Sequence, residues 1–219
     1  MKEKTALFIK RVIMSVIGVS LLGVCVALLR KANFGTDPFT CFVVGIANVC
    51  HSTYGIIYPI VIGVLLVIVF FLNKHYIGLA TVLNLFLVGT VGDIAFKIIN
   101  NLYDANTIPV RIITLAIALI ILCFASSLYI TADLGVSSYD AISLIVSDKK
   151  IKFLQYRVCR IITDLLCVIV GFLFHATIGV GTVITAFCMG PLTQFFNTYV
   201  AEKMLYGKNG KPKVQEAKS

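Results

Sequence analysis

The feature that most constrains this chain is the length of its uncharged apolar runs. Neither Ile112–Ala132 nor Ala176–Ala201 contains a single Asp, Glu, Lys, Arg or His residue. About 20 apolar residues cross the hydrocarbon core of a bilayer as a helix. In lipid the backbone must satisfy its own hydrogen bonds, so long uncharged runs favour helices. The sequence therefore predicts an all-α polytopic membrane protein.

Composition agrees with this prediction and excludes a soluble domain. Hydrophobic residues make up 59% of the 219 residues and charged residues only 13%, whereas soluble domains carry about 25% charged residues. The net charge is +9. Basic residues gather at the ends of apolar runs, which is typical of topology signals rather than of nucleic-acid binding. The clusters are Lys2, Lys4, Lys10 and Arg11; Lys149, Lys150 and Lys152; and Lys203, Lys208, Lys211, Lys213 and Lys218. The expected partner is the lipid bilayer, and no nucleic acid.

The cysteines and histidines do not predict a metal site or a cofactor. The seven cysteines lie mostly inside apolar stretches and form no CxxC pair, which is typical of buried free thiols. The sequence has no HExxH, GxSxG or phosphate-loop motif, so we do not expect an enzyme. The N-terminal apolar run lacks a small-residue cleavage site, and we interpret it as a helix of the fold.

The second constraining feature is an internal repeat. A shift of 100 residues, with one residue inserted near position 50, aligns the two halves of the chain. The aligned pairs include Arg11 with Arg111, Ala32–Gly35 with Ala132–Gly135, and Ile77–Val82 with Ile178–Val183. Apolar helices share Leu, Ile and Val by chance, but matched Gly, Thr and Arg residues indicate a duplication.

Each predicted unit has three long helices and one short helix after a glycine-centred break. In the first repeat, residues 1–100, we expect long helices at about 10–30, 54–73 and 76–97 and a short one at 37–50. In the second, residues 101–201, we expect long helices at about 111–131, 154–174 and 177–200 and a short one at 137–147. Residues 202–219 form a polar, basic tail.

The short helices decide the topology. A dozen helical residues reach about 18 Å, less than the roughly 30 Å core, so these segments are expected to be broken, re-entrant or interfacial. Each unit then crosses three times, and the two units are inverted. The alternative is four crossings per unit and parallel repeats. Both models place the two termini in the cytoplasm. The weakly charged loop 101–109 favours the inverted model. Arg30 and Lys31 count against it, because inversion places these two basic residues outside.

Polar residues at the starts of the short helices form the first candidate site. Asp37 is positioned to cap a helix whose first residue is Pro38, and Ser137 is the matching candidate, with Asp140 three residues later. A helix start inside a membrane favours anions or polar ligands. The alternative is that these residues are simple caps at the interface.

The third long helices carry a second set of polar candidates. Thr81 with Asn84, and Thr182 with Thr185, are spaced three residues apart, so each pair shares a helix face. These faces either pack against other helices or line a central site between the repeats.

Arg160 and Asp164 are a third candidate pair, one turn apart in the predicted helix 154–174. Ionisable residues within a membrane indicate a functional site by default. The alternative, which we favour, is a structural ion pair near the headgroups.

The glycine-rich motifs resemble the YczE/YyaS/YitT family of bacterial integral membrane proteins. The motifs that carry the resemblance are Phe34–Phe39, Leu134–Ala141, Ile178–Thr185, Gly190-Pro191 and Phe195-Phe196. The second unit departs from the first at Ser138, which replaces Pro38, and at Gly181, which replaces Ala80. The resemblance implies a bacterial plasma-membrane location and supplies no substrate.

Two functions are compatible with these observations. The first is a small-solute transporter, or a substrate-binding membrane subunit, with a site between the repeats for a small polar or anionic solute. The second is an accessory or scaffold protein without a transported solute, which would form a homo-oligomer or bind a membrane partner. A cavity between the halves would favour the first, and a filled interface the second.

Overall fold

The computed structural model describes residues 2–104, 107–148 and 156–206. Within these ranges the chain is helical and contains no strand. The helices are α1 (Lys2–Ala32), α2 (Pro38–Val49), α3 (Tyr54–Leu72), α4 (Leu79–Leu102), α5 (Ile108–Ala132), α6 (Ser138–Asp148), α7 (Tyr156–Leu173), α8 (Val180–Phe196) and α9 (Glu202–Tyr206). A 3-10 turn at Lys74–Tyr76 precedes α4, and a π-helical turn at Asn197–Ala201 joins α8 to α9.

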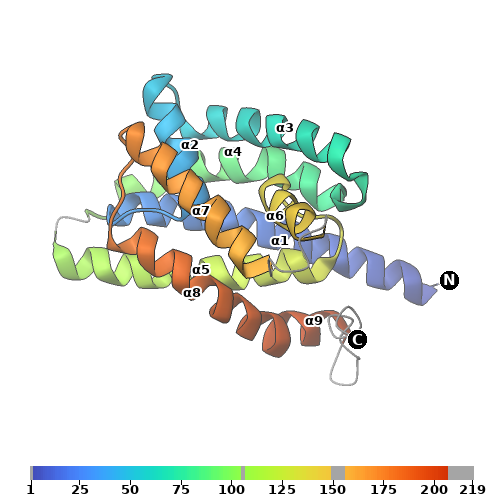
Figure 1. Ribbon diagram of the computed structural model, residues 1–219. Helices are drawn as coiled ribbons and strands as arrows, with labels where there is room; N and C mark the ends of the chain where they lie inside the picture. The colour runs from blue at the N-terminus through green and yellow to red at the C-terminus, as the bar shows by residue number, and fades with distance from the viewer. Residues whose placement is uncertain (1, 105–106, 149–155, 207–219) are drawn as a thin grey trace.

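Helices α1 and α5 form the centre of the bundle and run in opposite directions (Figure 1). Gly18 allows their close contact, because a Cβ at this position would lie 2.9 Å from the carbonyl oxygen of Ala125. Helix α4 packs on α1, and α8 packs on α5. The short helix α2 packs on α7, and the short helix α6 packs on α3.

Two non-helical segments, the first break (residues 33–37) and the second break (residues 133–137), interrupt the chain after α1 and α5. Because α1 and α5 are antiparallel, the first break follows α1 towards one end of the bundle and the second follows α5 towards the other (Figure 1). Both described termini, and the second break, lie at the same end, opposite the connection between α4 and α5 (Figure 1).

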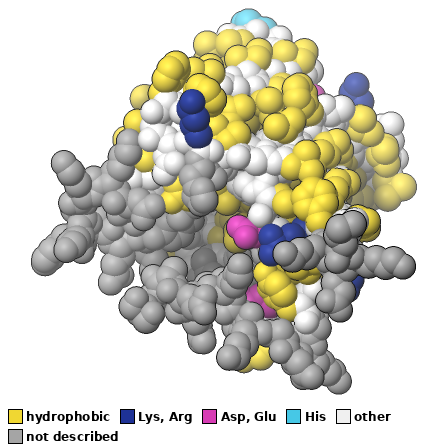
Figure 2. All heavy atoms as spheres, turned by 90° about the vertical axis from the view of Figure 1, so that its right-hand side faces the viewer, with side chains coloured by type: hydrophobic (Ala, Val, Ile, Leu, Met, Phe, Trp, Pro, Cys, Tyr) yellow, Lys and Arg dark blue, Asp and Glu magenta, His cyan; other side chains and the backbone are white. Residues whose placement is uncertain are grey.

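The outer surface of the bundle is apolar. Phe71, Leu102 and Phe187 expose 80%, 77% and 74% of their surface, which a water-soluble protein would not sustain over a contiguous area. Hydrophobic side chains also cover much of the described surface at the end that carries the termini (Figure 2). Among the described residues, four helical stretches are long and apolar enough to cross a membrane: Thr5–Ala32, Tyr54–Leu72, Leu79–Leu102 and Ile108–Ala132. The chain is a multi-pass membrane protein.

The predicted elements agree with the structure in kind and differ in their ends. The expected short helices 37–50 and 137–147 are present as α2 and α6, and α1 begins well before residue 10. The two remaining predicted spans correspond to α7 and α8, whose described apolar parts, Ile161–Leu173 and Val180–Met189, are shorter than the other four.

Helical structure also continues into the segment that we expected to be a polar tail. Ala201 and Leu205 are buried against Met14 and Leu128, which belong to α1 and α5. The hydroxyl of Tyr206 accepts a hydrogen bond from Arg11, at 3.3 Å. Burial of the apolar residues of α9 therefore extends the helical part of the chain to Tyr206.

Candidate functional site

The two breaks have the same backbone conformation. Asn33 and Asp133 have φ angles of 51° and 53°, and Gly35 and Gly135 have φ angles of 98° and 104°. Asn, Asp and Gly tolerate this left-handed region better than other residues, because the first two have short polar side chains and Gly has no Cβ. The glycines that mark the breaks in the sequence are therefore required by the backbone.

Each break lies against the start of a long helix from the other half of the chain. The amide of Gly181 in α8 donates to the carbonyl of Phe34 at 2.8 Å, and the amide of Ala80 in α4 donates to the carbonyl of Leu134 at 2.9 Å. These bonds use amides of the first helical turn, which have no partner within their own helix. We call these two contacts the seams.

Glycine is also required on the helix side of both seams. A Cβ on Gly78 would overlap the carbonyl oxygen of Leu134, and a Cβ on Gly179 would overlap that of Phe34. The backbone approaches too closely for any side chain at either position. The motif Ile77–Val82 and its counterpart Ile178–Val183 thus hold equivalent contacts.

The four predicted polar residues of α4 and α8 are buried, and two of them, Thr81 and Thr182, lie at the seams. Thr81 donates to the carbonyl of Val136 at 2.7 Å and accepts from the amide of Gly78 at 3.1 Å. Thr182 lies beside Gly35 in the first seam. Thr185 donates to the carbonyl of Thr182 at 2.9 Å. Thr81 therefore hydrogen-bonds across the second seam, whereas Thr182 packs beside Gly35 without a hydrogen-bond partner for its hydroxyl among the described residues. Asn84 is described below.

The sequence prediction for the start of α2 is confirmed. Asp37 has extended backbone angles, its Oδ2 accepts from the amide of Thr40 at 3.1 Å, and Pro38 occupies the first helical turn. This is the usual arrangement of an N-cap, in which a side-chain oxygen satisfies a free amide of the first turn.

The starts of the two short helices meet inside the protein. The ring of Phe39, in α2, stacks on that of Tyr139, in α6, with centroids 4.5 Å apart. The ring of Tyr58, in α3, meets Phe39 edge-on at 6.1 Å. All three are at most 9% exposed. Residues from both halves therefore build one aromatic contact.

Polar groups surround this aromatic contact. The buried hydroxyl of Tyr58 donates to Asn84 Oδ1 at 2.6 Å. Asp37 and Asp140 stand at the starts of α2 and α6, within two residues of Phe39 and Tyr139 in the chain. The hydroxyl of Tyr129, in α5, donates to Asp140. Three predicted site residues therefore adjoin the aromatic contact: Asn84 through its hydrogen bond to Tyr58, and Asp37 and Asp140 through their places beside Phe39 and Tyr139. We call these six residues the central cluster.

The predicted residues Asp164, Arg160 and Ser137 are not members of the central cluster. Asp164 accepts a hydrogen bond from the hydroxyl of Tyr139, which links it to the central cluster. The side chain of Arg160, its partner in the predicted ion pair, lies outside the described residues. Ser137 is half-buried in the second break, and its carbonyl accepts from the amide of Ala141 at 2.8 Å.

Two arginines at matching positions contact the ends of the central helices. Arg111 donates to the carbonyl of Ala32 at 2.8 Å and also to that of Asn33, so it caps the C-terminus of α1. Arg11 lies 3.6 Å from the carboxylate of Asp133, at the C-terminus of α5. Each arginine thus stands where the negative end of the other central helix favours a cation.

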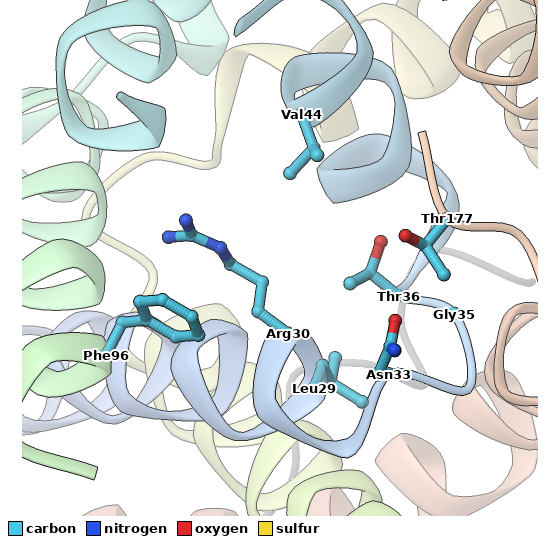
Figure 3. A pocket seen from close by; sticks show the side chains of 8 residues that line it. All are labelled: Leu29, Arg30, Asn33, Gly35, Thr36, Val44, Phe96 and Thr177. Carbon is cyan, nitrogen blue, oxygen red and sulfur yellow. The ribbon is translucent and has the colours of Figure 1, made fainter. Parts of the chain in front are cut away.

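A third arginine points into a cavity of about 140 Å³ beside the first break (Figure 3). Arg30 donates to Asp93 Oδ1 at 3.0 Å, and its guanidinium carbon lies 4.2 Å from the centre of the Phe96 ring. The cavity is lined from α1, the first break, α2, α4 and the segment before α8, which contributes Thr177. Both halves of the chain therefore contribute to its walls.

Sequence reasoning missed several residues of these sites. Tyr58, Tyr129 and Tyr139 could have been found, since a tyrosine in an apolar helix requires a partner for its hydroxyl. Arg30 was counted only as a charge against the inverted topology. Its partner Asp93 lies 63 residues further along the chain, and the sequence pattern gave no sign of this pairing.

A family model described as "Family of unknown function (DUF6198)" matches residues 9–198. The chain belongs to this family. The matched range includes both breaks, the central cluster and the cavity, so these features lie in the part that the family model covers.

Two bacterial relatives extend the comparison. The chain is 22% identical over 193 residues to the uncharacterized protein YyaS of Bacillus subtilis, covering 88% of this chain and 94% of that protein. It is 27% identical over 182 residues to an uncharacterized protein of Haemophilus influenzae, covering 83% and 81%. The first match confirms the resemblance to YyaS-type proteins. No solved structure matches the chain.

Proposed function

We propose that this DUF6198 protein binds and transports a small polar or anionic solute between two inverted repeats in the bacterial plasma membrane. The observation that carries the proposal is the pair of seams, in which each break lies on the helix start of the other half. Inverted-repeat transporters place their sites at the repeat interface, where discontinuous helices expose backbone and polar groups.

The central cluster supports a solute site at this interface. It combines aromatic surfaces with the carboxylates of Asp37 and Asp140 and the amide of Asn84, all within or beside apolar helices. Ionisable residues in such places are costly, and they often mark substrate or ion pathways. The cavity at Arg30 adjoins this cluster, because the buried ring of Tyr54 contacts both Arg30 and Tyr58.

The orientation belongs to the same proposal. Three crossings per unit place both termini in the cytoplasm with the basic clusters around residues 2–11 and 149–152, and place the loop at 103–107 outside. The paired structures of the breaks and the antiparallel α1 and α5 support this arrangement. The relatives from Bacillus subtilis and Haemophilus influenzae are bacterial, which agrees with a plasma membrane.

Uptake into proteoliposomes tests the function. Purified protein would be reconstituted and offered labelled phosphate, sulfate, acetate, lactate, glycine and glucose. We expect uptake of at least one solute and a loss of about tenfold or more in the Asp140→Asn variant, since the loss of a hydrogen bond to a charged group, here the partly buried carboxylate that accepts from Tyr129, costs about 1.5–3 kcal/mol. The matched control, Asp104→Asn, changes an exposed carboxylate and should leave the rate unchanged.

Two outcomes would contradict the proposal. One is the absence of uptake of every solute by the intact protein, and the other is an Asp140→Asn variant that transports at the original rate. A stable complex with another membrane protein after mild solubilisation, combined with absent uptake, would instead favour the accessory or scaffold function.

A further inference from the structure

We propose that the cavity at Arg30 is a binding site for a small oxyanion or carboxylate. Arg30 supplies the one charged side chain among the residues that line the cavity in the described part of the chain. The remaining lining is apolar or neutral and polar. A pocket of this kind, apolar with a few convergent polar groups, is the usual form of a small-molecule site.

The guanidinium of Arg30 has donors left for such a ligand. A guanidinium carries five N–H donors in a planar fork, and Arg30 uses Nη1 for Asp93 Oδ1 at 3.0 Å. Among the described residues it makes no other hydrogen bond. The guanidinium carbon lies 4.2 Å from the centre of the Phe96 ring, and this contact restricts the orientation of the planar guanidinium group. A fixed fork of this kind suits the paired oxygens of carboxylates, phosphate and sulfate.

Neutral polar groups stand across the cavity from Arg30. The hydroxyls of Thr36 and Thr177 and the side chain of Asn33 face the same space (Figure 3). Hydroxyl and amide groups can donate to the oxygens of an anion that Arg30 does not reach. Thr177 precedes α8 and Thr36 belongs to the first break, so a ligand here would contact both halves of the chain.

The surrounding charges leave the site suited to an anion. The carboxylate of Asp93 is held by Arg30 and by the amide of Gly55 at 2.8 Å, and that of Asp37 accepts from the amide of Thr40 in the α2 cap. Neither belongs to the cavity lining. Lys31 and Arg111 lie at the same end of α1 and add positive potential.

The size of the cavity limits the ligand. A cavity of about 140 Å³ is close to the roughly 150 Å³ cavity that holds benzene, a molecule of six heavy atoms. Phosphate, sulfate, acetate and lactate are of this size, whereas a nucleotide or a disaccharide is not. The idea that this anion is the transported solute rests on the proposed function. Anion binding itself is measured without transport, so it can be detected even if the protein transports nothing.

Thermal unfolding of the purified full-length protein in phosphatidylcholine nanodiscs tests the proposal. The probes are sodium sulfate, phosphate and acetate, each compared with sodium chloride at equal ionic strength. Because a ligand stabilises the state that binds it, we expect at least one probe to raise the midpoint temperature. Arg30→Gln should weaken this binding by about tenfold or more, the effect of losing a charged hydrogen-bond partner. Lys97→Gln, which removes an exposed cation, is the matched control.

The variant Asp93→Asn separates a binding site from a structural ion pair and does not depend on the stability of Arg30→Gln. The amide oxygen of Asn at position 93 can still accept from the amide of Gly55. The negative charge of Asp93, which competes with an anion for the guanidinium of Arg30, is removed. A binding site predicts that the anion binds Asp93→Asn more tightly than the original protein. A purely structural pair predicts that both variants are destabilised and that no probe restores either one.

The source of the anion is distinguished by a second arm. If a lipid phosphate occupies the site, nanodiscs that contain phosphatidylglycerol should raise the midpoint temperature of the original protein but not that of Arg30→Gln. The soluble probes should then have no effect on either protein. Equal responses of the original protein and Arg30→Gln to every probe and lipid, or no response of the original protein, would overturn the proposal.

Discussion

At the scale of single residues, glycines decide how closely the two halves approach each other. Gly35 and Gly135 permit the left-handed backbone of the breaks, and Gly78 and Gly179 leave room for the carbonyls that the breaks present. A side chain at Gly78 or Gly179 would overlap backbone atoms, which cannot move aside as the end of a flexible side chain can. The seams therefore depend on four positions that the repeat also matches in sequence.

Substitution of the seam glycines tests this dependence. We expect Gly78→Ala and Gly179→Ala each to lower the free energy of unfolding by about 1–3 kcal/mol, the usual cost of overpacking. Unfolding in mixed micelles by titration with sodium dodecyl sulfate measures the change. Gly63→Ala is the control, because no atom lies within 4 Å of the added Cβ; equal losses in all three variants would contradict the seam contacts.

The hydrogen bond between Tyr58 and Asn84 can be tested by a double-mutant cycle. Tyr58→Phe removes the donor at 2.6 Å and leaves a buried amide oxygen unsatisfied, which costs about 1–3 kcal/mol. The double variant Tyr58→Phe, Asn84→Leu should be less destabilised than the sum of the two single variants. The same unfolding titration gives the coupling energy, and strictly additive effects would show that the two side chains do not interact.

At the scale of elements, contacts at helix ends add to the packing of helix faces. Arg111 caps α1, Arg11 contacts the end of α5, and Asp37 caps α2. In a membrane a free helix end cannot be satisfied by water in the core, so each cap from another element fixes the relative position of two helices.

Removal of the α1 cap measures this contribution. Arg111→Gln should destabilise the protein by about 1–2 kcal/mol, because two carbonyls at the C-terminus of α1 lose a charged donor. Thermal unfolding in detergent follows the effect. Lys97→Gln, an exposed cation near the same end, should change stability by no more than about 0.5 kcal/mol. A similar loss in both variants would mean that the effect comes from net charge alone.

The sequence predicted the elements better than their contacts. Apolar length predicted the helices, and Gly35, Gly135 and Pro38 predicted the breaks and the start of α2, because these features depend on local backbone preferences. The extension of the C-terminal helices to Tyr206 was missed, because it depends on distant contacts such as that between Leu205 and Met14. The start of α1 at Lys2, before the predicted residue 10, was also missed.

The candidate site was predicted only in part for the same reason. Asp37, Asn84 and Asp140 were identified as polar residues in apolar surroundings, and in the structure all three belong to the central cluster. The threonines Thr81 and Thr182 were grouped with them by spacing, yet they lie at the seams. Spacing gives the face of a helix, but the partner of that face depends on how the helices rotate and cross.

At the scale of the whole molecule, we propose that the chain contains two units of three crossings that face opposite sides of the membrane. The antiparallel α1 and α5 support it, as do the two equivalent seams, in which each break contacts a helix start of the other half. Four crossings per unit would make the repeats parallel, and the halves could not then exchange equivalent contacts about a common axis in the membrane plane.

The most direct test of this claim is the sidedness of the loop that joins the two units. In a cysteine-free background, Asp104→Cys and Thr5→Cys would be labelled with a membrane-impermeant maleimide in right-side-out spheroplasts and after lysis. Three crossings per unit predict that Asp104→Cys is labelled in intact spheroplasts and Thr5→Cys only after lysis. Labelling of both positions on the same side of the membrane would contradict the inverted repeat.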